Sequence, residues 1–144
     1  MQISDVPLGF GAGLLGTAAM LLPEILAWRT WGIQGVLEWH ETQKLVARLT
    51  RNPSLKTALA LHFVNGGIIG IPFLFLTPYV TFLSKPVFGI AYGVAVWLLT
   101  LAPVHRLITG IPLLSHPQGW RPILVSLLGH VAFGLTLGLF AYAT

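Results

Sequence analysis

Apolar residues in this chain gather into four long runs, separated by short stretches that hold nearly all of the charges. Each run has about 18 residues or more, which is enough for a helix to cross a hydrocarbon core of about 30 Å. We therefore expect four membrane-spanning helices at about 7–28, 54–83, 86–108 and 122–143.

Proline marks the beginning of every apolar run, at Pro7, Pro53, Pro86 and Pro122. Proline is well suited to the first turn of a helix because its missing N–H would have no helical partner there. Two further prolines, Pro72 and Pro78, occur only in the second run, where we expect a kink.

The longest polar connection lies between the first two runs and predicts an amphipathic helix at about 33–51. Trp39, Leu45 and Leu49 fall on one helical face, whereas Lys44 and Arg48 fall on the other. Such a helix is typical of segments that lie in the membrane interface. A helix that docks a soluble partner has the same pattern, so both interpretations stay open.

Composition supports a membrane protein of a single domain, residues 1–144. Hydrophobic residues make up 55% of the chain and charged residues 8%, against about 25% charged in soluble domains. The absence of cysteine excludes disulfides, thiol catalysis and cysteine-ligated metals. The net charge of +4 accompanies no nucleic-acid-binding motif, and we expect no nucleic-acid partner.

The distribution of positive charge predicts the orientation. One set of loops carries seven lysines and arginines, and the opposite side carries Lys85 alone. By the positive-inside rule the rich side faces the cytoplasm, which places both termini outside a cytoplasmic membrane. The seven residues are Arg29, Lys44, Arg48, Arg51, Lys56, Arg106 and Arg121.

A repeated motif indicates an internal duplication. The pattern His-x3-Gly-x3-Gly occurs in the second run at His62 and again in the fourth at His130. The first and third runs share a Gly-x3-Gly pair followed by a proline at identical spacing. We therefore expect two duplicated hairpins, in which glycines allow close helix packing. These glycines are Gly9, Gly13, Gly66, Gly70, Gly89, Gly93, Gly134 and Gly138.

Several segments resemble the YagU-like group of small four-helix membrane proteins of bacteria and archaea. The resemblance implies the four-helix topology and a prokaryotic membrane, and it implies no activity. It rests on the run Gly11-Ala-Gly-Leu-Leu-Gly-Thr-Ala-Ala-Met20, the His62 segment, Val96-Trp97-Leu98, Pro103 and Gly129-His-Val-Ala-Phe-Gly134.

Four titratable residues are candidates for chemistry inside the membrane. His62 and His130 lie about 13 and 12 Å from the starts of their helices, at 1.5 Å per residue. Glu24 and His105 come late in the first and third runs, which places them near the same side. An ionisable side chain in hydrocarbon is a functional candidate by default.

Three functions are compatible with these residues. In the first, the histidines donate hydrogen bonds across helix interfaces, and the protein is a small accessory or scaffold subunit of a larger membrane complex, for example a respiratory one, or of a homo-oligomer. In the second, His62 and His130 ligate haem b, with a glycine one turn on leaving space for the porphyrin. In the third, Glu24, His105 and the two histidines relay protons or a small ion.

Enzymatic motifs are weak, and we expect neither catalytic residues nor a metal site. Ser115-His116 lacks a nucleophile elbow. In Glu38-Trp-His40-Glu41 the two glutamates are one helical turn apart while His40 points elsewhere, so a solvated helix face is the better interpretation.

Overall fold

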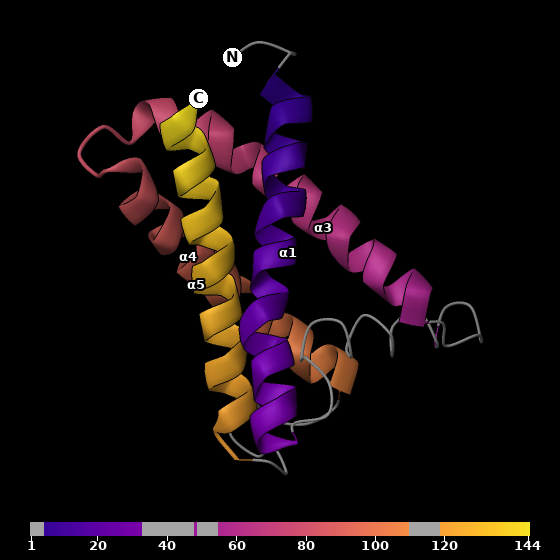
Figure 1. Ribbon diagram of the computed structural model, residues 1–144. Coiled ribbons are helices and arrows are strands. Elements are labelled where there is room, and N and C mark those ends of the chain that lie inside the picture. Colours follow the sequence, from indigo (N-terminus) through magenta and orange to yellow (C-terminus); the bar gives the residue numbers. More distant parts are fainter. Residues whose placement is uncertain (1–4, 33–47, 49–54, 110–118) are drawn as a thin grey trace.

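The computed structural model describes residues 5–32, 48, 55–109 and 119–144, without the side chains of residues 55, 58 and 101–109 (Figure 1). Within these ranges the chain forms four α-helices and no strand, which confirms the all-α prediction. They are α1 (Asp5–Trp31), α3 (Leu55–Leu76), α4 (Lys85–Thr109) and α5 (Arg121–Ala143), and a short 3₁₀ helix, η1 (Thr77–Tyr79), follows α3.

Helix starts agree with the proline pattern. Pro7, Pro86 and Pro122 each lie in the first turn of a helix, where the missing N–H costs no hydrogen bond. Pro53 lies outside the described residues. At its other end, α1 is followed by Gly32, whose N–H donates to the Trp28 carbonyl over 3.1 Å with a positive φ of 61°.

The second helix ends earlier than the sequence indicated. The span expected to reach residue 83 is α-helical only to Leu76 and then tightens into η1. Pro78 provides the physical reason, because it has no N–H to donate to the carbonyl four residues before it. Pro72 is accommodated inside α3.

The helices pack as two close pairs that meet through α1 and α5. Helix α3 packs on α1, α4 packs on α5, and α1 and α5 run side by side in opposite directions (Figure 1). The first residues of α1 and the end of α5 lie at the same end of the bundle.

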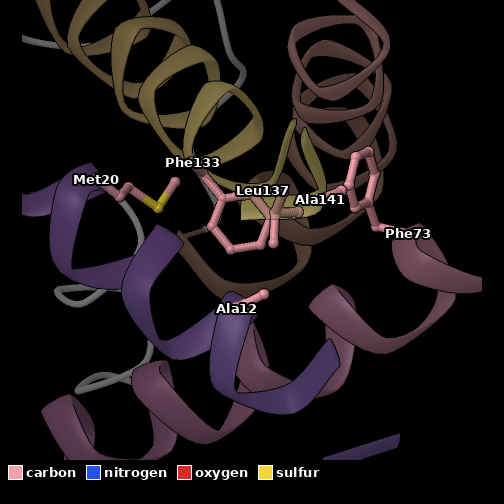
Figure 2. Close-up of a cluster of buried hydrophobic side chains, with 6 residues drawn as sticks. All are labelled: Ala12, Met20, Phe73, Phe133, Leu137 and Ala141. Carbon is pink, nitrogen blue, oxygen red and sulfur yellow. The ribbon is translucent and has the colours of Figure 1, made fainter. Parts of the chain in front are cut away.

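An apolar core occupies the centre of the bundle (Figure 2). Leu137 of α5 and Phe73 of α3 are completely buried. The ring of Phe73 stacks on Phe88 of α4 at 5.1 Å between centroids, and the Tyr92 hydroxyl of α4 donates to the Ile69 carbonyl of α3 over 2.7 Å. These aromatic contacts connect α3 and α4. The other buried members of the core are Ala12, Met20, Phe133 and Ala141.

Three described helical segments are long and apolar enough to cross a membrane: Asp5–Trp31, Leu59–Tyr79 and Arg121–Ala143. In α4 the segment Lys85–Thr100 is a shorter apolar helix. The predicted interfacial helix at about 33–51 lies outside the described residues, apart from Arg48.

Candidate functional site

Five polar side chains are buried in the described part of the bundle, and three of them can ionise. Exposed fractions are 2% for Glu24, 6% for His62 and 4% for His130, and Thr17 and Ser126 are equally enclosed. They come from α1, α3 and α5. Polar groups are costly to bury unless they interact, so their positions relative to one another decide what the site can do.

Contacts between α1 and α5 fix which residues face each other. A Cβ added to Gly129 would lie 3.0 Å from the Met20 Cγ, and Ala27 packs against Val125 in a buried cluster. Glu24 lies between Met20 and Ala27 on the same face of α1, one turn from each. Glu24 therefore lies on the face of α1 that packs against the turn of α5 between residues 125 and 129.

His130 is held from within its own helix. Its Nδ1 lies 2.9 Å from the backbone carbonyl of Ser126. A carbonyl oxygen only accepts, so Nδ1 must carry the proton. In the neutral ring Nε2 then presents a lone pair, which can accept a proton or bind a ligand. The bond runs along α5, whereas the structural interpretation of the sequence expected the histidines to donate across helix interfaces.

Side-chain direction places Glu24 and His130 at a similar level of the bundle. Side chains on a helix lean toward its N-terminus. Because α1 and α5 are antiparallel, the Glu24 side chain leans toward Met20, and that of His130 leans toward Ser126. Met20 faces Gly129, whereas the neighbouring His130 belongs to the stripe of α5 that packs on α4, since a Cβ on Gly93 would meet the His130 carbonyl. The two side chains therefore lean toward a common level of the bundle, Glu24 from α1 and His130 from the α4-facing stripe of α5.

His62 lies at the matching level on α3, which packs on a neighbouring face of α1. Gly66, one turn after His62, is in backbone contact with Gly13, and a Cβ there would lie 3.1 Å from the Thr17 Cβ. His62 is therefore next to the turn of α1 that begins near Thr17. His130 lies next to the same turn, because a Cβ on Gly16 would lie 2.7 Å from the Phe133 ring, just one turn from His130.

The predicted packing glycines all lie where two helix backbones touch. In the α1–α3 pair, Gly9 and Gly13 face Gly70 and Gly66, respectively. In the α4–α5 pair, a Cβ on Gly134 would lie 3.0 Å from the Gly93 Cα, and the Gly89–Gly138 contact is of the same kind. The other predicted residue, His105, belongs to α4, but its side chain lies outside the described ones.

Two residues of the site escaped sequence reasoning. Thr17 lies one turn after Gly13, and its hydroxyl donates to the Gly13 carbonyl over 2.8 Å. Ser126 lies one turn before His130 and supplies the carbonyl. The sequence contains a signal for both residues: each small polar residue is four positions from a predicted site residue, on the same helical face.

The packing does not fit the haem hypothesis. That hypothesis requires open space beside the glycine one turn after each histidine. Gly66 is covered by Thr17 and Gly13, and Gly134 is covered by Gly89 and Gly93. A porphyrin face cannot occupy positions already taken by helix backbone. Among the described residues there is also no group of three or more His, Cys, Asp or Glu side chains that could hold a metal ion.

Comparison with known proteins identifies a family and no activity. No curated protein and no solved structure matches the chain. The model of DUF6789, described as a family of unknown function, matches residues 3–144. The chain therefore belongs to the DUF6789 family.

Proposed function

We propose that this protein is an intramembrane proton relay in which Glu24 and His130 exchange a proton, with His62 as a second imidazole at the same level. The observation that carries the proposal is the burial of Glu24 to 2% exposure on the α1 face opposite Ser126. Chains of buried carboxylates and imidazoles carry protons in membrane pumps and transporters.

Energetics favours a functional role for Glu24 over a packing role. An acidic side chain costs about 2.5–3.5 kcal/mol at the centre of a spanning helix; Glu24 lies in the second half of α1, where the cost is smaller but of the same sign. Methionine or glutamine would fill similar space without a carboxylate. A buried glutamate at position 24 is expected if its carboxylate itself takes part in proton transfer. The Nδ1–H of His130, which donates to the Ser126 carbonyl, is consistent with the same role, because the neutral ring then carries its basic lone pair on Nε2.

The accessory-subunit alternative has less support. Large apolar side chains cover the outside of the helices, including Leu22, Ile68 and Leu99. A helix in contact with lipid needs the same apolar outer surface. The apolar surface therefore does not favour a protein partner over the bilayer. A larger complex or a homo-oligomer therefore stays a prediction from the sequence.

For the architecture we propose four membrane crossings arranged as two duplicated hairpins. The α1–α3 and α4–α5 pairs pack in the same way. In each pair, a Gly-x3-Gly segment of one helix packs against the His-x3-Gly-x3-Gly segment of the other. Helix α4, 25 residues long, has the length to complete the fourth crossing. The proposal also includes an interfacial helix at about 33–51 and the placement of both termini outside. It further includes the resemblance to the YagU-like group, which implies a prokaryotic membrane.

Proton flux into liposomes tests the relay. Purified protein is reconstituted with a pH-sensitive dye in the lumen, and an imposed potential drives protons across the membrane. The wild type should acidify the lumen, and Glu24→Gln should reduce the flux to that of empty liposomes because the amide cannot exchange a proton. Thr136→Val is the matched control, since its half-buried hydroxyl only donates to the Ala132 carbonyl of its own helix. Equal flux in Glu24→Gln and wild type would overturn the proposal.

A further inference from the structure

Cationic and aromatic side chains gather where the end of α1 meets the start of α5. Arg29 and Arg121 are exposed there, and the tryptophans at positions 28, 31 and 120 are 58%, 45% and 66% exposed. We call these five residues the Trp31–Arg121 surface. The buried contact between Ala27 and Val125 holds the two helix ends together.

Arg121 is positioned by an aromatic ring. Its guanidinium carbon lies 5.7 Å from the centre of the Trp31 ring, which is a cation–π contact. An arginine held by an aromatic ring can still donate hydrogen bonds from the edge N–H groups of its planar guanidinium to a phosphate. The arginine is therefore in contact with the ring while the residue stays exposed.

The surroundings of Arg121 favour an anion. Asp5 and Glu24 are the acidic residues that the structure describes; Asp5 begins α1 at the opposite end of the bundle, and Glu24 is buried. The start of α5 is the positive end of its helix dipole, and Trp120 at the N-cap provides no side-chain hydrogen bond. Arg29 lies in the last turn of α1, where it offsets the negative end of that helix.

We propose that the Trp31–Arg121 surface binds the phosphate headgroup of an anionic phospholipid. Tryptophan concentrates at the headgroup level of membranes, and basic side chains at helix ends bind anionic headgroups. Both α1 and α5 are long and apolar enough to cross the membrane, so their ends lie at the depth where such headgroups are found. The inference is independent of the proton relay.

Lipid titration of the purified full-length protein tests this inference. Native mass spectrometry counts phosphatidylglycerol and phosphatidylcholine molecules of identical acyl chains bound to the detergent-released protein. We expect selective retention of phosphatidylglycerol, with about five-fold weaker binding in Arg121→Gln, because one cation near an anionic surface contributes on that order. Trp31→Leu should also weaken binding, since it removes the ring that orients the guanidinium.

Lys56→Gln is the matched control, because it removes one exposed positive charge from the start of α3. The start of α3 lies away from the end of α1 and the start of α5, which carry the Trp31–Arg121 surface (Figure 1). The Lys56→Gln variant should keep the lipid preference. Equal losses in Arg121→Gln and Lys56→Gln, or equal retention of both lipids by the wild type, would overturn the inference. Should Arg121→Gln fail to fold, Arg121→Lys keeps the charge and tests the guanidinium; binding as tight as in wild type would then count against the site.

Discussion

At the scale of single residues, the protein combines a carboxylate and two imidazoles with very little polar surface around them. Glu24 lies between Met20 and Ala27 on one face of α1. The Nδ1–H of His130 donates to the Ser126 carbonyl. This bond determines which ring nitrogen carries the proton, and therefore which nitrogen carries the lone pair in the neutral ring.

The tautomer of His130 is a direct consequence. Nitrogen-15 chemical shifts of the imidazole in detergent-solubilised protein should show Nδ1 protonated and Nε2 unprotonated in the neutral ring. Ser126→Ala should leave this tautomer unchanged, because the acceptor is the backbone carbonyl and not the hydroxyl. A neutral ring protonated mainly at Nε2 would contradict the arrangement.

Residue spacing predicted part of the site. The His-x3-Gly-x3-Gly repeat led to both histidines and to the glycines next to them. It could not reveal the bond to Ser126, because a histidine four residues from a small polar residue can turn to its own helix or to a neighbour. Nor could it reveal that backbone already fills the space beside Gly66 and Gly134.

At the scale of the helices, close packing depends on particular glycines and not on glycine content. A Cβ on Gly13 would lie 2.7 Å from the Gly67 Cα of α3, while a Cβ on Gly11 of the same helix would meet nothing within 4 Å. The difference arises because position 13 faces α3 and position 11 faces away from the other helices.

Alanine substitutions at these two positions should therefore differ in their effect on stability. Gly13→Ala should lower the free energy of unfolding by about 1–3 kcal/mol, the usual cost of overpacking, because backbone cannot move aside easily. Gly11→Ala should change it by no more than about 0.5 kcal/mol, as expected for a surface position. Unfolding in mixed micelles measures both, and similar losses would contradict the close α1–α3 contact.

The helix starts that a proline marks were predicted well. The end of α3, which a proline causes, was predicted less well. Pro86 and Pro122 lie within one residue of the observed starts of α4 and α5. The second run stays apolar beyond Leu76, so hydropathy alone extended the helix, although Pro78 removes the hydrogen bond needed to continue it.

At the scale of the whole molecule, the sequence predicted four helices but not their order in the bundle. Helices that face lipid on one side and core on the other are apolar all round, so their hydrophobic pattern does not identify the buried face. The pairing of α1 with α5, and the bond from Tyr92 to Ile69 that connects α4 with α3, depend on contacts that no periodicity records.

Topology can be tested with single cysteines, because the natural chain contains none. Ser84→Cys and Thr144→Cys should react with a membrane-impermeant maleimide in intact cells, and Thr57→Cys only after lysis. All three positions are exposed, so burial does not limit the reaction. Labelling of positions 84 and 144 from opposite faces would contradict four crossings.

The central claim is that Glu24 exchanges a proton inside the bundle next to His130. Infrared difference spectroscopy across a pH change detects carboxyl groups as they gain or lose a proton, and four acidic residues in the chain make assignment practical. We expect a carboxyl signal that disappears in Glu24→Gln and shifts in His130→Gln, because the proposed relay couples the carboxylate to that imidazole. A difference spectrum that is unchanged in Glu24→Gln would contradict it.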